Sequence, residues 1–336
     1  MRAIVQERYG PPDDVLRPRE VETPTAGDGE VLVRVRAASM HVDVWHVVTG
    51  RPYVLRLMGN GLRGPTRRIP GTDLAGRVES VGANVTRFGP GDAVFGEVAA
   101  TQWANGGTFA EYVVARQDVL ERKPDNVTFE QAAVVPTSGT IALRGLRDAG
   151  GLRAGQEVLI NGAGGAVGSI AVQIARAAGA GVTGVDRADR LDMVRSMGAD
   201  RVIDYAREDV TRGDRRYDLV LDVASTLSLR DCKRVLTPTG LYVLIGHDHY
   251  GAAAGRVFGS LPRLLGLVAR ARFDAHLPRP SFRMPDRHET LAFLGTLLES
   301  GELTPIVART FPLDEVPAAM RCMQAGQVVG RVVITP

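Results

Sequence analysis

The feature that most constrains this chain is a cluster of glycines within residues 157–180, which read EVLINGAGGAVGSIAVQIARAAGA. Residues 157–160 form a short apolar run typical of a buried strand, whereas Ile170, Ile174 and Ala177 recur at the spacing of one helix face. The glycines therefore stand where a strand turns directly into a helix. This order predicts a sheet against which helices pack.

Each main glycine of this turn has a physical role in the predicted structure. Gly162 permits the tight turn, Gly165 lets the backbone approach a pyrophosphate, and Gly168 lets the helix pack closely on the sheet. The N–H groups at the helix start, together with the positive end of its dipole, favour an anion. The sequence therefore predicts a dinucleotide site. The expected contacts are Gly162, Gly164, Gly165, Ala166, Val167 and Gly168.

The glycine turn lies in a longer alternation of strands and helices that starts near residue 127. Apolar strand patterns occur at residues 157–160, 181–185, 201–203, 219–223 and 241–245. Continuous apolar strands joined by helices predict a parallel sheet covered on both faces, a doubly wound Rossmann domain. The first third instead shows short alternating strands and Gly/Pro turns, which indicate an antiparallel barrel. The expected fold class is α/β.

Composition excludes several classes of protein. The 336 residues include 44% hydrophobic and 24% charged residues, the balance of a globular protein. No stretch reaches the roughly 18 apolar residues of a membrane span. The net charge of +3 is spread along the chain without a basic run, so nucleic-acid binding is not expected. With only Cys232 and Cys322, and no signal-peptide pattern, a cytoplasmic protein is expected.

The residues after the second Rossmann strand give conflicting indications of cofactor type. Asp186 ends this strand, and a carboxylate there accepts hydrogen bonds from ribose hydroxyls, which favours NAD. Arg187 and Arg190 follow, and either can pair with a 2′-phosphate, which favours NADP. A solvated charge cluster at a helix start is the alternative interpretation. We expect NADP(H) rather than NAD(H) by a narrow margin.

Three separated segments resemble one family. Residues 70–96 (PGTDLAGRVESVGANVTRFGPGDAVFG), residues 155–168 (GQEVLINGAGGAVG) and residues 330–334 (GRVVI) are similar to medium-chain dehydrogenases/reductases. Residues 51–62 and 302–320 look most like its zinc-independent quinone oxidoreductases, the zeta-crystallin-like and reticulon-interacting-protein-like branch. The resemblance implies a GroES-like catalytic domain over residues 1–126 and 286–336 and a Rossmann domain over residues 127–285. It also implies a homodimer, formed through residues 241–245.

The resemblance also bears on zinc, because zinc-dependent relatives carry cysteine and histidine ligands at defined places. The matching positions here are His41, Thr72 and the pair Pro136 and Thr137. One imidazole without a thiolate falls short of the three protein ligands of a catalytic zinc. His41 with Asp43 or Asp73 remains a weak alternative site. We therefore expect no metal.

Without zinc, the expected acceptors are conjugated molecules. A hydride from a nicotinamide that adds to a quinone or an α,β-unsaturated carbonyl leaves a delocalised charge, which a hydrogen-bond donor can stabilise. The candidate donors are His41, Asp43 and Tyr53. Each has a structural alternative: His41 as a core histidine, Asp43 as the cap of a helix starting near Trp45, and Tyr53 as barrel packing.

The resemblance suggests further cofactor contacts. Thr137 or Thr140 is expected to lie near the nicotinamide, and Gly246 and His247 follow the last Rossmann strand. Arg331 is placed like a pyrophosphate-binding arginine of some relatives.

Three functions are compatible with these residues. The first is a zinc-independent NAD(P)H-dependent reductase of quinones or enones. The second is an enoyl reductase or alcohol dehydrogenase specific to one pathway intermediate, and the third is a non-catalytic nucleotide-binding sensor or scaffold. Residues 261–271 are expected to form a helix over the active-site entrance, with a dimer contact or a membrane surface as alternatives.

Overall fold

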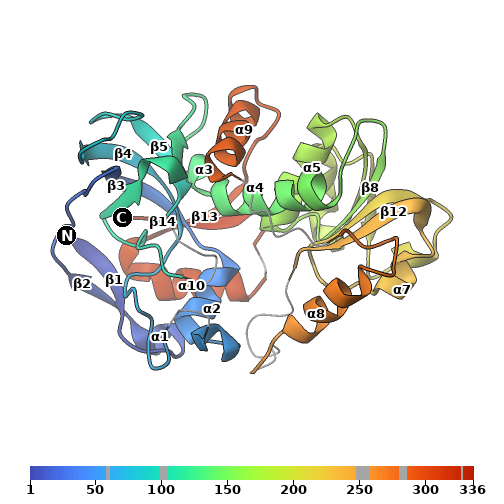
Figure 1. The fold of residues 1–336 in the computed structure, drawn as a ribbon, viewed down its shortest axis with the longest axis horizontal. Coiled ribbons are helices and arrows are strands. Elements are labelled where there is room, and N and C mark those ends of the chain that lie inside the picture. Colours follow the sequence, from blue (N-terminus) through green and yellow to red (C-terminus); the bar gives the residue numbers. More distant parts are fainter. Residues whose placement is uncertain (58–60, 99–103, 247–256, 280–285, 327) are drawn as a thin grey trace.

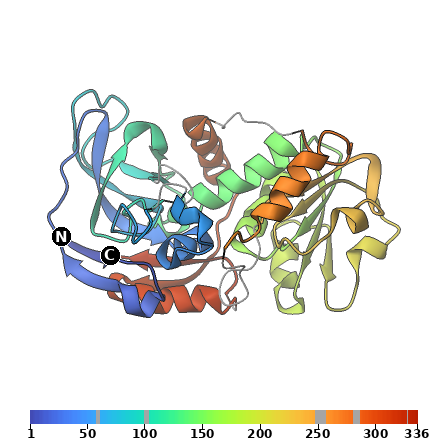
Figure 2. The ribbon, with the colours of Figure 1, turned by 60° about the horizontal axis from the view of Figure 1, so that its bottom comes forward.

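The computed structural model describes residues 1–57, 61–98, 104–246, 257–279, 286–326 and 328–336. It consists of two halves, each built on its own large β-sheet (Figure 1). Both chain ends lie in the same half, and the middle of the chain forms the other (Figures 1 and 2).

The half that holds the chain ends is built on a seven-stranded sheet in the order β13-β14-β3-β4-β5-β7, with β6 paired to β3. Its strands are β3 (Glu30–Ser39), β4 (Asp73–Val81), β5 (Ala93–Glu97), β6 (Tyr112–Arg116), β7 (Leu120–Arg122), β13 (Val307–Pro312) and β14 (Arg331–Thr335). Most pairs are antiparallel, as the short alternating strands predict, and β1 (Arg2–Gln6) pairs separately with β2 (Leu16–Glu20). Strands from both ends of the chain thus share one sheet.

The other half contains a parallel sheet in the order β10-β9-β8-β11-β12. The strands are β8 (Glu157–Asn161), β9 (Gly181–Asp186), β10 (Arg201–Asp204), β11 (Tyr217–Asp222) and β12 (Leu236–Leu244). In β8, Val158 and Ile160 pack into the core on one face and Leu159 into the core on the other, all fully buried. Burial on both faces explains the continuous apolar run and confirms the doubly wound sheet.

Helices cover both sheets and join the two halves. They are α1 (Pro12–Val15), α2 (Val42–Thr49), α3 (Phe129–Ala133), α4 (Pro136–Leu143), α5 (Ala166–Ala177), α6 (Leu191–Ser196), α7 (Leu229–Cys232), α8 (Leu261–Arg270), α9 (Arg287–Glu299) and α10 (Val316–Gln324). The α4 helix lies between the halves and continues into a π-helical segment, η3 (Arg144–Ala149) (Figure 1). None of the described helices is long and apolar enough to cross a bilayer.

The outer edge of β12 is partly covered by the chain itself. Tyr242 N donates to His276 O at 2.8 Å, and a ring nitrogen of His276 lies 2.8 Å from Gly240 O. This segment follows α8, so α8 is tied to the β12 side of the sheet. The predicted dimer contact along residues 241–245 therefore meets an edge that is already paired at Tyr242.

Candidate active site

A cavity of about 1440 Å³ lies where the two halves meet, and residues of both line it. The half that holds both chain ends, called the catalytic half from here on, contributes His41, Asp43 and Arg331. The half with the parallel sheet, called the Rossmann half, contributes Gly162 and Gly246. In parallel sheets, ligands bind at the carboxyl ends of the strands, next to the point where strand order reverses. Here that point lies between β8 and β11, which places the cavity where a dinucleotide is expected.

The glycine turn has the geometry that its sequence predicts. Gly162 has φ +84°, a conformation that favours glycine. A Cβ on Gly168 would lie 2.0 Å from Gly162 O, so only glycine permits this close approach of α5 to the loop. Gly162, Gly165, Ala166 and Val167 line the cavity, whereas Gly164 and Gly168 shape the turn behind it.

The start of α5 offers a site for an anion. Gly165 is the N-cap residue, and among the described residues no side chain caps this helix start. The first N–H groups of a helix have no acceptor within the helix and form its positive end. The open glycine cradle and the uncapped helix start therefore fit the pyrophosphate of a dinucleotide.

Asp186 holds the glycine turn in place. Its Oδ2 accepts from Gly164 N at 2.7 Å, and its Oδ1 accepts from Arg187 N at 2.8 Å. Arg190 Nη1 lies 3.6 Å from the same carboxylate, and its Nη2 also donates to the backbone oxygens of Gly326 and Val328. Asp186 is only 5% exposed, so its carboxylate mainly accepts hydrogen bonds from within the protein. Sequence reasoning did not anticipate this structural role of Asp186 and Arg190.

Arg187 and Arg190, the two arginines after β9, differ in the groups with which they pair. Arg187 pairs with Asp189 on the surface, and both it and Arg190 line the cavity. Tyr205, which follows β10, also lines the cavity and is more than half exposed. The sequence analysis missed Tyr205; its position directly after a Rossmann strand was the available signal.

The predicted donors take different positions. His41 is buried and is the N-cap of α2, and its Nδ1 lies 3.0 Å from both Asp43 N and Asp43 Oδ2. It is His41, rather than Asp43, that caps the helix, and the helix starts at Val42 rather than near Trp45. Both His41 and Asp43 line the cavity. The structure does not bring Tyr53 there: its ring is 41% exposed and lies under the Arg56 guanidinium.

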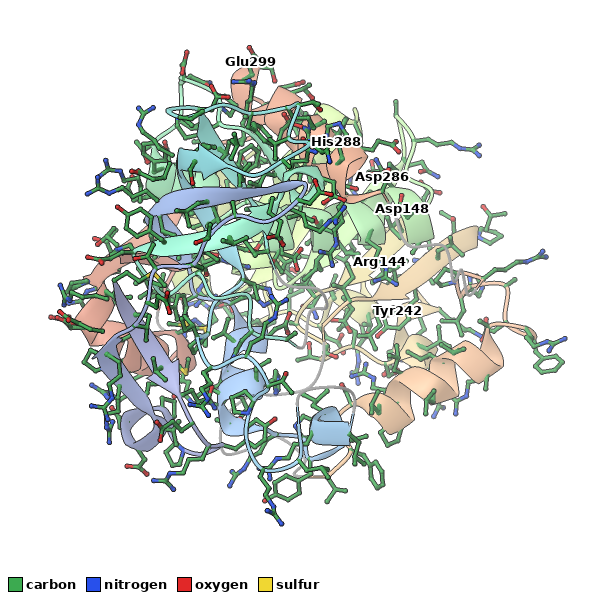
Figure 3. All side chains as sticks on the ribbon, turned by 60° about the vertical axis from the view of Figure 1, so that its left-hand side comes forward. Arg144, Asp148, Tyr242, Asp286, His288 and Glu299 are labelled. Carbon is green, nitrogen blue, oxygen red and sulfur yellow. The ribbon has the colours of Figure 1, made fainter. Side chains whose placement is uncertain are left out.

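The α4 helix presents residues to the cavity that sequence reasoning did not select. Ile141 of α4 lines it, and so do Arg144 and Asp148 of the η3 segment that follows (Figure 3). Thr137 and Thr140 are not among the lining residues, and Thr137 Oγ1 donates to Asp73 Oδ1 instead. A π-helical segment often marks a functional site, but the sequence gives no signal for it.

A buried polar cluster lies behind the cavity wall and joins the two chain ends. Arg331 of β14 is 4% exposed, and its Nη1 lies 3.4 Å from Asp73 Oδ2 and 3.3 Å from Ser39 Oγ. Its Nη2 donates to Ser138 Oγ of α4. Burial lowers the pKa of Arg331, and the carboxylate of Asp73 opposes this shift. The guanidinium of Arg331 thus forms a structural ion pair, although Arg331 also lines the cavity.

Glu97 is the second buried carboxyl of this cluster. It lies opposite Asp73 in the β4–β5 ladder and is 8% exposed. Burial, and then the negative charge of Asp73, raise the pKa of Glu97 to about 7. Glu97 is therefore the group of this cluster that changes charge near neutral pH.

The places that hold zinc in metal-dependent relatives do not form a ligand set here. Thr72 Oγ1 and Thr137 Oγ1 both donate to Asp73, whose charge is already opposed by Arg331. In the described part of the chain, no three His, Cys, Asp or Glu side chains are arranged to hold a metal ion. The donor set therefore does not fit a catalytic zinc.

The carboxyl ends of β11 and β12 form the opposite wall. Gly246 lines the cavity, whereas His247 lies outside the described residues. Asp222, fully buried at the end of β11, accepts from Asn161 Nδ2 at 2.7 Å and from the Tyr242 hydroxyl at 2.9 Å. This network fixes the ends of three neighbouring strands, and no local spacing in the sequence predicts which of its members pair.

A glycine turn that fits a dinucleotide, facing a second, mostly antiparallel half across one cavity, is the arrangement of nicotinamide-dependent oxidoreductases. Comparison with known proteins agrees. Residues 27–125 match the family described as alcohol dehydrogenase GroES-like domain, and residues 197–334 match that described as zinc-binding dehydrogenase. The chain belongs to the medium-chain dehydrogenase/reductase superfamily, in its quinone oxidoreductase branch.

Individual relatives cover almost the whole chain. NAD(P)H oxidoreductase RTN4IP1, mitochondrial, of Mus musculus is 30% identical over 99% of this chain and 89% of its own length. Quinone-oxidoreductase QR1, chloroplastic, of Triphysaria versicolor is 29% identical over 100% of this chain and 98% of its own. The solved quinone oxidoreductase from Coxiella burnetii superposes with a TM-score of 0.78 at 27% identity, covering 100% of this chain and 99% of that one. These similarities confirm the predicted family and the GroES-like plus Rossmann fold class.

Proposed function

We propose that this enzyme transfers a hydride from NADPH to a quinone or an α,β-unsaturated carbonyl without a metal ion. The observation that carries the proposal is the single cavity in which the glycine turn and His41 both lie. The relatives named as quinone oxidoreductases support the acceptor class.

Different residues of the cavity bind the cofactor and stabilise the acceptor. The glycine turn and the start of α5 bind the pyrophosphate, while Ile141 and Gly246 bound the nicotinamide end. Because Asp43 engages Nδ1 of His41, Nε2 is the ring nitrogen left to donate to the acceptor oxygen. When bound, the reduced nicotinamide supplies the hydride.

The proposed independence of zinc rests on the kind of acceptor and on the residues that stand near the zinc-ligand positions of metal-dependent relatives. The charge that develops on a conjugated acceptor is spread over several atoms, so one hydrogen-bond donor is sufficient. An isolated ketone concentrates this charge on one oxygen and needs a stronger electrophile. The carboxylate of Asp73 is paired with Arg331, so it is not free to act as a metal ligand.

The proposed preference for NADPH rests on the corner after β9. Both oxygens of the Asp186 carboxylate accept backbone N–H groups, so the carboxylate is poorly placed to select ribose hydroxyls. Arg187 needs to exchange only a surface pair with Asp189 to meet a 2′-phosphate.

The test begins with fluorescence titrations of NADPH and NADH side by side. 9,10-Phenanthrenequinone and a panel of enones are then added to the complex, with and without a metal chelator. We expect tighter binding of NADPH and turnover that is indifferent to the chelator. Turnover that the chelator inhibits would contradict the proposal. If no acceptor of the panel is reduced, a pathway-specific enoyl reductase or alcohol dehydrogenase, or a nucleotide sensor, is favoured instead.

Three further properties are part of the proposal. The division into residues 1–126 with 286–336 and residues 127–285 is supported by the sheet that β3 and β14 share. A homodimer is also proposed, but two β12 strands cannot pair at Tyr242, whose N–H is taken within the chain. A cytoplasmic location follows from the cysteine usage alone.

A further inference from the structure

The α8 helix lies on the side of the Rossmann sheet where the nicotinamide half of a dinucleotide is expected. The glycine turn follows β8, and Asp186 ends β9. On the other side of the switch point, Arg263 of α8 lies 3.9 Å from Asp222 of β11 and donates to the Tyr242 hydroxyl of β12. A dinucleotide laid across that point puts its adenosine near Asp186 and its nicotinamide near β12. The α8 helix therefore borders the reacting end of the cavity.

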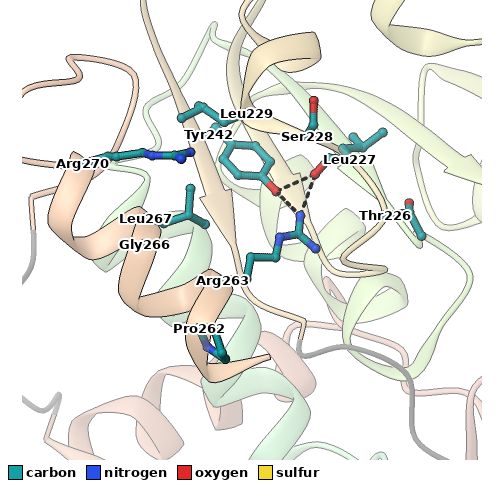
Figure 4. Close-up of a pocket in the computed structure, with 10 residues that line it drawn as sticks. All are labelled: Thr226, Leu227, Ser228, Leu229, Tyr242, Pro262, Arg263, Gly266, Leu267 and Arg270. Atoms are coloured by element: carbon teal, nitrogen blue, oxygen red, sulfur yellow. Dashed lines mark hydrogen bonds between the residues drawn. The ribbon is translucent and has the colours of Figure 1, made fainter. Parts of the chain in front are cut away.

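Arg263 anchors α8 to the parallel sheet and to the loop that follows β11. Arg263 donates to Ser225 O at 2.5 Å, to Leu227 O at 2.7 Å and to the Tyr242 hydroxyl at 3.2 Å. Figure 4 shows the guanidinium reaching from α8 to Tyr242 and Leu227. The anchor fixes which face of the helix is turned to the cavity.

The face of α8 turned to the cavity is apolar yet uncovered. Leu261, Leu264 and Val268 recur at helical spacing and all line the cavity. Leu264 is 45% exposed and Val268 42% exposed, values that are unusual for aliphatic side chains inside a binding cavity. Phe258, just before the helix, also lines the cavity and is 59% exposed.

The opposite wall of this part of the cavity comes from the catalytic half. Pro52 and Leu55, which follow α2, line it together with Phe258 and Gly259. Val54 N donates to Val257 O at 3.1 Å, so the two walls are joined at one end. No described residue of these two segments that lines the cavity carries a charge. Together these residues form an aliphatic trough that belongs to the same cavity as His41.

We propose that this trough binds an unbranched alkyl substituent of the acceptor, so that the preferred substrates are quinones or enones with a long aliphatic chain. From Leu261 to Val268 the helix rises about 10 Å, enough to line a chain of roughly eight carbon atoms. Such a chain covers the exposed Leu264 and Val268 and loses its own contact with water. The inference rests on the proposed function for the carbonyl end of the substrate.

The test measures binding without turnover. Saturated 2-alkanones from 2-butanone to 2-undecanone are titrated calorimetrically into the complex with NADP⁺, which cannot donate a hydride. Each methylene that leaves water strengthens binding by about threefold to fourfold at most. We expect 2-undecanone to bind at least 100-fold more tightly than 2-butanone.

Two variants of one helix provide a matched comparison. Leu264→Asp places a charge in the trough and should reduce the chain-length effect to less than tenfold, with NADP⁺ affinity unchanged. Leu265→Asp makes the same change at a neighbour that is 64% exposed and does not line the cavity, and should leave the effect intact. Val268→Asp repeats the first change in case Leu264→Asp folds poorly.

The outcomes separate the two proposals. A flat series in the wild type, or equal losses in the Leu264 and Leu265 variants, would overturn the trough. A steep series in an enzyme that reduces no conjugated acceptor would leave the trough standing and overturn the proposed reaction.

Discussion

The cofactor side and the acceptor side of the cavity are built in different ways. The cofactor side is a continuous piece of chain, in which Gly162, Gly165 and the start of α5 follow one another directly. Behind the acceptor side, a buried cluster brings together Ser39, Asp73, Ser138 and Arg331, and the last two are 193 residues apart in the chain. The first depends on backbone conformation, whereas the second depends on a buried ion pair. The two sides should therefore fail in different ways when mutated.

The largest expected effect is on the cofactor side. In Gly168→Val, the new Cβ would meet Gly162 O, a backbone atom that cannot move without opening the turn. We expect NADPH affinity to fall by about 100-fold or more, because a displaced turn loses its N–H contacts to the pyrophosphate. Fluorescence titration measures this loss.

Gly295→Ala is the matched control. Gly295 lies within α9, and a Cβ there makes only ordinary contact with Glu121. The variant should bind NADPH normally and gain about 0.5–1 kcal/mol of stability. Equal loss of NADPH binding in both variants would contradict the role assigned to Gly168.

The next effect is on the acceptor side and concerns stability. Asp73→Asn removes the carboxylate that compensates the buried Arg331. We expect the free energy of unfolding to fall by about 3 kcal/mol, because an uncompensated buried charge remains. Urea denaturation measures it, with Asp192→Asn in an exposed pair as the control that should show no measurable loss. A similar result for both variants would mean that the ion pair contributes nothing.

A smaller effect depends on pH and belongs to Glu97. Its pKa of about 7 in the folded protein exceeds the ordinary value of 4.5, so the folded state holds the proton more tightly. Its contribution to stability is full below about pH 4.5 and is lost as the pH rises through 7. Relative to Glu97→Gln, the wild type should lose roughly 2 kcal/mol between pH 5 and 8. Parallel pH profiles for both proteins would show that Glu97 does not titrate in this range.

The smallest expected effect concerns cofactor selection. Arg187→Gln should weaken NADPH binding about tenfold and leave NADH binding within a factor of two, because only the 2′-phosphate loses a partner. Arg195→Gln changes an arginine that pairs on the surface with Asp192, and neither of these two residues lines the cavity, so the variant should affect neither cofactor. Loss of both cofactors in Arg187→Gln would assign Arg187 to the fold rather than to selection.

The same contrast explains what the sequence could predict. The alternation of strands and helices, the glycine turn and the position of Asp186 at the end of its strand follow from local spacing, and all are found as expected. The partners of Arg331 could not be predicted, since they come from three distant segments. Thr137 was expected at the nicotinamide but bonds Asp73, because helix phase and tertiary contact decide which face of α4 reaches the cavity. The available signal was Asp73 itself, an acidic residue at the start of β4, directly before the apolar residues 74–76.

The most direct test of the account is isotope transfer. NADPH carrying deuterium at both C4 positions is incubated with the enzyme and a long-chain 2-alkenal in the presence of a chelator, and the product is analysed by mass spectrometry. The account predicts one deuterium on the β-carbon of the saturated aldehyde. A reduced product without deuterium, or deuterium only on the carbinol carbon of an alcohol, would contradict it.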